Sequence, residues 1–526
     1  MITHKSSSLP QSRQFHLVGV LVTAGIVAIP SLNAIADTGP PATFRTPPGA
    51  TRSHVFKVKV FGNPVFVQKY KDIHYGHFPI SGATSIEIQI DQLVENVAVS
   101  PEYLDLDWHS DGKSVRFTLS RPRKLVVYIN ELDRLFLFAD APADSAPPCQ
   151  PTDMVNVLTF GADNTGGKLS TEAIVRAIEA TPKNGVLYFP PGVYRSATIA
   201  LKSHMTVYVS DGALIQGSTE VLDYPDREVD VHRTLGPPNV RLIMLDGVED
   251  VLITGFGTLD GQGRKLRAKK CSGQVIVVKN SRNVVVENLF LRDPASYNTR
   301  LLFSERVTFR NTKVINDQEV PNTDGIDPEG SRHVLIEDNF AYCSDDNVAV
   351  KIYHYDVTQD VYDVTVRGNV FLTRKSALKI GTETKHKAIR DVAFIDNDIV
   401  ECDRAIVIYL YDDADVRDIR FIDNRVERNY PDRRQRVIDI EMRQRLGAGR
   451  LSNVKIRNTF VSSAFPQPST IRDLDADHPV RDICIENYQV AGRTAGTLEE
   501  AQIKVLEHVQ GCSFCSSSDG LSCQQP

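Results

Sequence analysis

A short unit with apolar residues two positions apart recurs along the C-terminal two-thirds of the chain, and an Asn, Asp or Gly stands two positions after the second apolar residue. Subtracting residue numbers, successive units begin 23 to 35 residues apart. The pattern predicts one inward-facing strand in each coil of a stacked structure, with the polar residue at the corner. A parallel β-helix with loops of variable length is expected, because the units are mostly β-branched and no long helical period separates them. The units are Val251/Ile253, Val284/Val286, Val307/Phe309, Val334/Ile336, Val364/Val366, Val392/Phe394, Ile419/Phe421, Val454/Ile456 and Ile483/Ile485.

The segment before these repeats has a different pattern. Short alternating runs such as Ser85–Ile90 and Val115–Leu119 lie between turn residues and predict a small β-sandwich over 51–146. A Pro-rich stretch then separates it from the β-helix, which is expected over 150–510. The sole tryptophan, Trp108, gives little support for a sugar-binding platform, so we expect the sandwich to brace the second domain. The fold class is therefore all-β.

One helix is expected between the two regions, from about Ser170 to Glu179, with Ser170 or Thr171 as its N-cap. It would cover the open end of the first coil, where backbone groups and core side chains would otherwise be exposed.

Composition indicates an exported protein that does not bind nucleic acid or a membrane. The net charge of −6 over 526 residues disfavours polyanionic partners. Lys5 and Arg13 precede the apolar run Leu17–Ile29, which predicts a signal peptide over 1–36, cleaved after Ala36. A linker over 37–50 would follow. We expect a secreted or periplasmic monomer.

The cysteines are compatible with an oxidising compartment. Cys512, Cys515 and Cys523 lie in the tail over 511–526, where a disulfide is expected. Cys512 and Cys515 lack the second pair of ligands that a zinc site needs. Cys343 and Cys402 fall within the repeats and are expected to be buried.

Carboxylates cluster in two segments, 322–327 and 344–347, with Asp324 and Asp345 21 positions apart by subtraction. Stacked coils could bring Asp324, Asp345 and Asp346 together. Neighbouring carboxylates can hold different protonation states, because repulsion and burial raise one pKa while hydrogen bonds lower another. Hydrolysis of a glycosidic bond needs such a pair. Asp327 is expected to stabilise a turn.

These features together resemble the polygalacturonase-like glycoside hydrolases of family 28 and the related dextranase family 49. The resemblance rests on Phe160-Gly161-Ala162-Asp163, Pro190-Pro191-Gly192-Val193-Tyr194, Asn322-Thr323-Asp324 and Ser344-Asp345-Asp346, in that order. It implies a right-handed parallel β-helix and an inverting hydrolase without cofactor or metal. It also implies that Asp345 is the general acid, that Asp324 and Asp346 activate water, and that Asn322 orients the substrate or the carboxylates.

The chain departs from the family pattern at two places. Ser376 stands where the polygalacturonases have a histidine, and Val407 and Tyr409 stand where they have the Arg and Lys that bind a galacturonate carboxylate. Loss of these cations removes charge-assisted hydrogen bonds worth roughly 1.5–3 kcal/mol each. A neutral sugar is therefore expected at the central subsite.

Several residues downstream of the acid pair could contact that sugar, and a short run around Lys351 and Tyr353 echoes the dextranases. Each residue could equally serve packing of the coils. The expected substrate-binding residues are Asn322, Lys351, Tyr353, Ser376, Lys379, Glu383, Arg404 and Tyr409.

Four other functions stay open at this point. A polysaccharide lyase would need a base and a cation, a transglycosylase would use the same residues but exclude water, and a carbohydrate-binding β-helix would need no carboxylates. A polygalacturonase proper is possible if Lys379 or Arg404 binds the carboxylate. The sugar, its linkage and endo or exo action are not predicted.

Overall fold

The computed structural model describes residues 43–142, 153–225, 238–353 and 359–515, and the backbone of three two-residue strands elsewhere. The chain divides into two compact units, residues 1–43 with 52–143 and residues 44–51 with 144–526. Residues 44–50, expected as linker, and Thr51, expected in the sandwich, thus group with the second unit, where the Arg45 backbone N–H donates to Asp211. The predicted signal peptide, apart from the strand Ile2–Thr3, lies outside the described residues.

The first unit contains two sheets of antiparallel strands with one parallel pair, β5 with β11. Their facing sides enclose a core that includes Ile86, Ile88, Val127 and Leu137, and Trp108 packs against it. The predicted sandwich-like layers are confirmed. One sheet contains β1 (Ile2–Thr3), β8 (Trp108–Asp111), β9 (Ser114–Leu119), β6 (Thr84–Gln89), β2 (Lys57–Val60) and β3 (Asn63–Val65). The other contains β4 (Val67–Tyr70), β5 (Ile73–Pro79), β11 (Arg134–Asp140), β10 (Arg123–Ile129) and β7 (Val97–Ser100), and the short helix η1 spans Glu102–Leu104.

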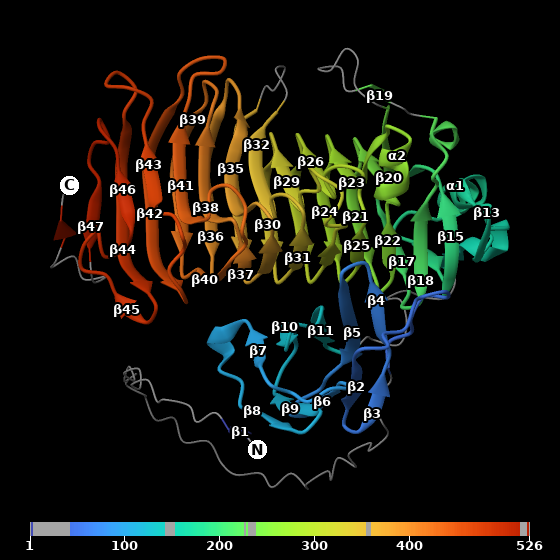
Figure 1. The fold of residues 1–526 in the computed structure, drawn as a ribbon. Helices are drawn as coiled ribbons and strands as arrows, with labels where there is room; N and C mark the ends of the chain where they lie inside the picture. Colours follow the sequence, from blue (N-terminus) through green and yellow to red (C-terminus); the bar gives the residue numbers. More distant parts are fainter. Residues whose placement is uncertain are drawn as a thin grey trace, which may run out of the picture. The chain divides into compact units, whose positions relative to one another are not determined.

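The second unit is the predicted right-handed parallel β-helix (Figure 1). Each middle coil has three strands that pair in parallel with the same three strands of the next coil. We call the three stacks faces 1, 2 and 3. Face 1 contains β12 (Met154–Asn156), β14 (Val186–Phe189), β17 (Met205–Val209), β21 (Glu249–Thr254), β24 (Arg282–Glu287), β27 (Glu305–Arg310), β30 (Arg332–Glu337), β33 (Val361–Arg367), β36 (Ala388–Ile395), β39 (Asp415–Ile422), β42 (Arg450–Val461), β44 (Val480–Val490) and β47 (Ser513–Cys515).

Faces 2 and 3 complete each coil. Face 2 contains β13 (Thr165–Leu169), β15 (Gly192–Ser196), β18 (Ala213–Gly217), β22 (Thr258–Asp260), β25 (Phe290–Arg292), β28 (Lys313–Ile315), β31 (Phe340–Cys343), β34 (Val370–Thr373), β37 (Asp398–Cys402) and β40 (Arg425–Asn429). Face 3 contains β16 (Ile199–Ala200), β20 (Pro238–Asp246), β23 (Ser272–Lys279), β26 (Thr299–Leu302), β29 (Ile326–Glu329), β32 (Val348–Ile352), β35 (Ser376–Thr384), β38 (Arg404–Leu410), β41 (Arg436–Met442), β43 (Ser469–Arg472) and β46 (Ile503–Val505). Antiparallel additions are β19 (Glu228–Val229), β45 (Arg493–Thr494) and β48 (Cys523–Gln524).

The repeated apolar pairs form face 1, as predicted. Val307, Val334, Val364 and Val392 are directly opposite one another in successive coils, and all are buried. The polar residue after each pair makes the corner in the left-handed region, for example Asp338 with φ 52°. Asn and Asp tolerate this conformation better than other residues with a Cβ.

A buried asparagine ladder follows these corners and was not predicted. Asn339, Asn369, Asn397 and Asn424 lie in consecutive coils, and each of the first three donates a side-chain N–H to the Oδ1 of the next, at 2.9–3.0 Å. Their second N–H donates to a backbone carbonyl. The ladder satisfies polar groups that would otherwise be unpaired inside the coil.

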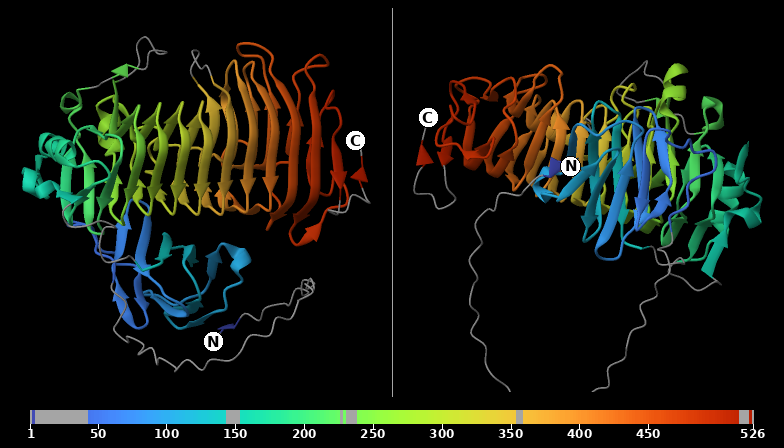
Figure 2. Two further views of the ribbon diagram at one scale, coloured as in Figure 1. Left: turned by 180° about the vertical axis from the view of Figure 1, so that it is seen from behind. Right: turned by 60° about the horizontal axis from the view of Figure 1, so that its bottom comes forward.

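The predicted capping helix is present as α1 (Thr171–Ala180), at one end of the β-helix (Figure 2). Ala173, Ile174, Ala177 and Ile178 are buried in the core of the coils. Ser170 occupies the N-cap position, but its hydroxyl accepts a hydrogen bond from the Asp163 backbone N–H and does not cap the helix. The other helices among the described residues of this unit are α2 (Gly263–Ala268), η3 (Val157–Phe160) and η4 (Val221–Asp223).

The cysteines of the coils are buried, as predicted. Cys343 and Cys402 are fully buried free thiols in the β-helix core. Cys512 is also a free thiol, and Cys515 lies opposite Cys523 where β47 pairs with β48. A disulfide in the tail stays a prediction. In the described part of the chain, no helix combines the length and apolar character of a bilayer span.

Candidate functional site

The predicted catalytic carboxylates lie at the start of neighbouring strands of face 3. Asp324 precedes β29, and Asp345 and Asp346 precede β32 one coil later. The coils meet closely here, since the Gly325 N–H donates to the Asp346 carbonyl at 2.8 Å. A Cβ at Gly325 would lie 2.3 Å from the Asn347 carbonyl oxygen, so only glycine allows this approach. The 21-residue spacing therefore corresponds to one coil.

Asp346 is a buried carboxylate with two strong donors. Its Oδ2 accepts from Lys379 Nζ at 2.6 Å, and its Oδ1 accepts from the Ser376 backbone N–H at 3.1 Å. Burial acts to raise the pKa of Asp346, but the Lys379 and Arg404 charges outweigh it and lower the pKa below its ordinary value. Asp346 is therefore ionised at neutral pH.

Asp345 has the opposite electrostatic environment, although it is the next residue. Burial, together with the charges of Asp324 and Asp346, raises the pKa of Asp345 to about 8, against the opposing charge of Lys379. Its Oδ1 accepts from the Asp346 backbone N–H at 3.0 Å, and the residue is partly exposed. Asp345 thus holds a proton at neutral pH where a substrate could reach it.

Asp324 shares a buried lysine with Asp327. Lys351 Nζ lies 3.1 Å from Asp324 Oδ2 and 2.8 Å from Asp327 Oδ2, and all three side chains are buried. Burial raises the pKa of Asp324, and the Lys351 charge opposes this rise. The expectation that Asp327 serves a turn is wrong, because it lies within β29 and faces the same cation as Asp324.

Three of the expected substrate-binding residues are buried and contact other groups of the protein. Ser376 is fully buried and contacts Asp346 through its backbone N–H, so a direct contact of its side chain with sugar is ruled out in this structure. Lys351 is likewise buried against Asp324 and Asp327. Tyr409 is 6% exposed, donates its hydroxyl hydrogen to Asp439, and stacks on Tyr411 with centroids 5.2 Å apart. These contacts favour packing within the coils over the expected role of Ser376, Lys351 and Tyr409 in substrate binding.

The other expected residues retain some exposure. Arg404 keeps a side chain 12% exposed, and its Nη1 lies 3.4 Å from the Tyr409 hydroxyl. Lys379, also 12% exposed, is bound to Asp346. Glu383 is 22% exposed and lies 3.8 Å from Arg445.

Tyr353 directly follows β32, and Asn322 stands two positions before Asp324. Tyr353 is half-buried, with the Lys385 ammonium 4.9 Å from its ring centroid. Asn322 is exposed, with a left-handed φ of 59°.

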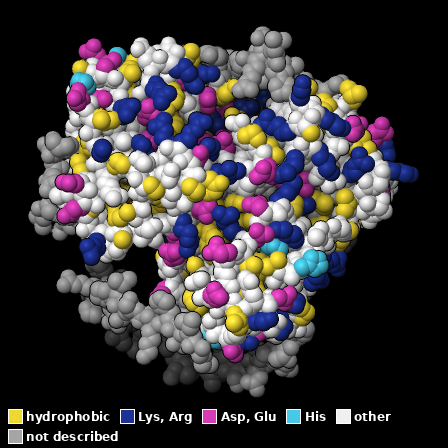
Figure 3. All heavy atoms as spheres, viewed as in Figure 1, with side chains coloured by type: hydrophobic (Ala, Val, Ile, Leu, Met, Phe, Trp, Pro, Cys, Tyr) yellow, Lys and Arg dark blue, Asp and Glu magenta, His cyan; other side chains and the backbone are white. Residues whose placement is uncertain are grey.

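Three charged residues near Tyr409 were missed by the sequence analysis. Asp439 and Glu441 on β41 stand directly opposite Val407 and Tyr409. Arg434 lies 3.5 Å from Asp439 and 3.4 Å from Glu441, and its guanidinium is 5.8 Å from the Tyr409 ring centroid. Aligning the repeated units for one coil beyond Tyr409 would have identified Asp439 and Glu441. Figure 3 shows Lys and Arg side chains interspersed with Asp and Glu side chains over this part of the β-helix.

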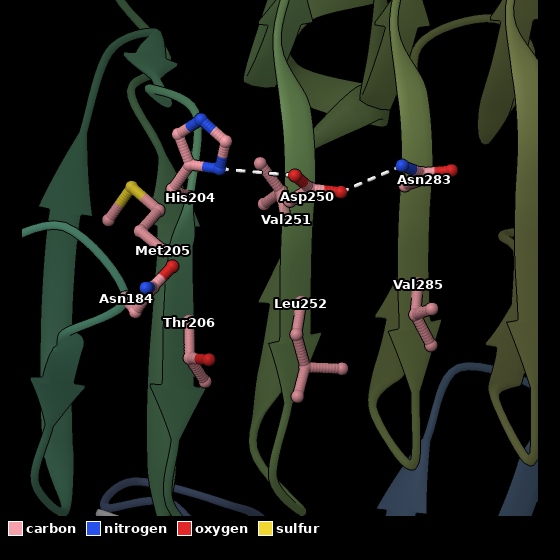
Figure 4. Close-up of a pocket in the computed structure, with 9 residues that line it drawn as sticks. All are labelled: Asn184, His204, Met205, Thr206, Asp250, Val251, Leu252, Asn283 and Val285. Atoms are coloured by element: carbon pink, nitrogen blue, oxygen red, sulfur yellow. Dashed lines mark hydrogen bonds and ion pairs between the residues drawn. The ribbon is translucent and has the colours of Figure 1, made fainter.

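A pocket lies on face 1, with a volume of about 240 Å³ (Figure 4). His204 Nδ1 lies 3.1 Å from Asp250, and Asn283 donates to Asp250 at 2.7 Å. His204, Glu249 and Asp250 are close enough to share a metal ion. However, Arg282 already binds Glu249, and both ring nitrogens of His204 face carboxylates, as in a histidine bridging two acids. None of the candidate catalytic residues lines this pocket.

Comparisons with known proteins agree with this fold. The model of "Glycosyl hydrolases family 28" matches residues 198–463, which is more than half of the chain. The model "Rhamnogalacturonase A/epimerase, pectate lyase-like" matches residues 154–213. A "Probable polygalacturonase" of Vitis vinifera is 27% identical over 219 residues, which are 37% of this chain and 44% of that protein. The chain thus spans less than half the length of this relative.

Two solved structures are similar in fold. The exopolygalacturonase from Thermotoga maritima has a TM-score of 0.58 and 23% identity, covering 70% of this chain and 92% of that one. Dex49A from Penicillium minioluteum has a TM-score of 0.58 and 12% identity, covering 91% and 97%. With the family match over the coils that hold Asp324, Asp345 and Asp346, the chain belongs to family 28 of the glycosyl hydrolases.

Proposed function

We propose that this protein cleaves the glycosidic bonds of a polysaccharide by hydrolysis with inversion, with Asp345 as the general acid. The observation that carries the proposal is the difference between two adjacent carboxyl groups. Asp345 is partly exposed with a pKa of about 8, while Lys379 keeps Asp346 ionised. An inverting enzyme needs one protonated and one ionised carboxyl group.

The proton balance of the reaction follows from these states. Asp345 gives its proton to the glycosidic oxygen as the bond from that oxygen to the anomeric carbon breaks. A water molecule attacks the anomeric carbon from the opposite face and loses a proton to Asp324 or Asp346. Asp345 ends ionised and the base ends protonated, so exchange with solvent restores the starting states.

The preferred substrate in this proposal has a neutral sugar at the central subsite. Val407 is fully buried there and carries no charge. Tyr409 and Asp439 are bound to each other, and Glu441 adds a second carboxylate on β41. With no cation at positions 407 and 409, a uronic acid would lack charge-assisted hydrogen bonds there.

A galacturonan is the second candidate, and one observation favours it. Arg404 and Arg434 both lie beside Tyr409, each with its guanidinium 5.8 Å from the ring centroid. Their side chains are 12% and 31% exposed, so either could form charge-assisted bonds with a substrate carboxylate. The name of the Vitis vinifera relative points in the same direction.

Release of reducing sugar tests both candidates. The wild type is assayed on neutral glucans, galactans, arabinans and fructans and on polygalacturonate, beside Asp345→Asn and the control Asp391→Asn, which changes an exposed carboxylate on β36. We expect release from a neutral polymer that is lost only in Asp345→Asn. Release from polygalacturonate that Arg404→Gln or Arg434→Gln abolishes would establish the second candidate. Full activity of Asp345→Asn would refute the catalytic proposal.

Export and a monomeric state complete the proposal. The charged and apolar pattern of residues 1–36 supports export, because a polysaccharide substrate is extracellular in most settings and the pattern is that of a signal peptide. Detection of the protein in culture medium, with an N-terminus at Asp37, would test the first part, and light scattering would test the second.

A further inference from the structure

The buried pair formed by Asp327 and Lys351 has no role in the proton transfers described above. Lys351 is 3% exposed and Asp327 is fully buried. Burying a lysine and an aspartate costs much free energy unless they are paired, and a hydrophobic pair would often be at least as stable. Their position next to Asp324 suggests a purpose other than stability.

The geometry places the lysine between two carboxylates. Lys351 Nζ donates to Asp324 Oδ2 at 3.1 Å and lies 2.8 Å from Asp327 Oδ2. The Tyr297 ring covers the ammonium, with its centroid 4.2 Å away. Since Lys351 is on β32 and Asp327 is on β29, the pair also links the two coils that hold the catalytic carboxylates.

We propose that Asp327 and Lys351 are positioning residues that fix the place and the charge of Asp324, the carboxylate that helps to activate water. This inference rests on the proposed function. Lys351 draws Asp324 into place and favours its ionised form, and Asp327 limits that effect by competing for the same ammonium. Asp324 can then be ionised and still basic enough to accept a proton from water.

Other charged groups face this cluster and set the background for its titration. Arg300 on β26 is bound to Glu329 on β29 through two hydrogen bonds of 2.7 Å. The remaining charged or titratable neighbours are Asp345, Asp346, Lys379, Glu383 and Tyr297. Lys379 lowers the pKa of Asp346, whereas burial raises the pKa of both Asp324 and Asp327, so the acid limb of the activity profile reports these two carboxyl groups together.

The proposal predicts opposite effects of two substitutions. Lys351→Met leaves Asp324 without its cation and beside another carboxylate, so the acid limb of kcat/KM moves to higher pH. Asp327→Asn leaves the whole ammonium to Asp324, so the same limb moves to lower pH. We expect kcat at neutral pH to fall by about 10-fold or more in Lys351→Met, while KM changes little. If the pair were merely structural, the acid limb of kcat/KM would stay at the same pH in both variants.

Controls separate this inference from the catalytic proposal. If Lys351→Met does not fold, the double variant Asp327→Asn with Lys351→Met replaces it, because this variant removes both charges of the pair. We expect the double variant to fold and to have the acid limb of kcat/KM close to its wild-type position. If Asp345→Asn abolishes activity while both single variants keep the wild-type limb, the positioning inference is wrong and the proposed function stands. If Asp345→Asn keeps full activity, the proposed function itself has failed.

A measurement without substrate tests the positioning inference even if the proposed function fails. Thermal unfolding of the wild type, Asp324→Asn, Lys351→Met and the double variant Asp324→Asn with Lys351→Met forms a double-mutant cycle. We expect the shifts in Tm to be clearly non-additive, and additive shifts would overturn the pairing of Asp324 with Lys351.

Discussion

The raised pKa of Asp345 predicts a pH-dependent cost to stability that Asp345→Asn removes. The pKa of this carboxyl is about 8 in the folded protein, compared with an ordinary value of 3.8. Between these values the folded chain binds one proton more than the unfolded chain, so stability falls as pH rises. The cost is about 1.4 kcal/mol for each pH unit in this range. From pH 5 to pH 7 it amounts to roughly 3 kcal/mol.

The asparagine variant lacks this titration but keeps a neutral side chain of similar shape. We therefore expect its stability relative to the wild type to improve by roughly 3 kcal/mol when the pH is raised from about 5 to about 7. Urea unfolding of both proteins at each pH measures the difference in their free energies of unfolding. The contributions of the other titrating groups cancel to first order, because both proteins contain them. Asp391→Asn, which changes an exposed carboxylate on β36, serves as the matched control, and we expect no change of that size in its relative stability.

An equal difference between Asp345→Asn and the wild type at both pH values would refute the reasoning. It would mean that Asp345 ionises in the folded protein as it does in the unfolded chain. Asp345 could then no longer be the proton donor at neutral pH.

Three further outcomes are expected. The value of kcat/KM should decline above about pH 8, because Asp345 loses its proton there, and a flat rate profile up to about pH 10 would speak against this assignment. Phe394→Ala should destabilise the β-helix by about 3–5 kcal/mol in urea unfolding, since the fully buried ring stacks on Phe421 with centroids 4.8 Å apart, and a loss below about 1 kcal/mol would contradict that packing. Asn397→Ala should cost about 1–3 kcal/mol in the same assay, because it leaves the partner groups of Asn369 and Asn424 unpaired, whereas an unchanged midpoint would show that the ladder adds nothing.

The fold could be predicted because its signal is repeated. Pairs such as Val334 and Ile336 recur in every coil and face the core, and each corner residue marks where the strand ends. The same repeat pattern could have predicted the asparagine ladder, because its residues stand one position after the corner residues. It was missed because a single Asn after a corner residue looks like part of the turn, and only stacking reveals the shared hydrogen bonds.

The candidate site was predictable in its carboxylates but not in their partners. Asp324 and Asp345 stand one coil apart in sequence, so stacking alone brings their segments together. The burial of Ser376 and Lys351 depends on side chains from neighbouring coils that cover them, which a single strand does not reveal. Asp412 shows the same limit: it stands in the polar run Tyr411-Asp412-Asp413-Ala414-Asp415, yet it is fully buried and bound by Arg445.

The most direct test of the account compares two substrates of the same sugar in the wild type and in Asp345→Asn. One is the polymer, whose leaving oxygen needs a proton, and the other is its 2,4-dinitrophenyl glycoside, whose leaving group needs none. If Asp345 is the general acid, the variant should lose about 100-fold or more of its kcat on the polymer and less than about 10-fold on the aryl glycoside. Equal losses on both substrates would contradict the assignment of Asp345 as the acid.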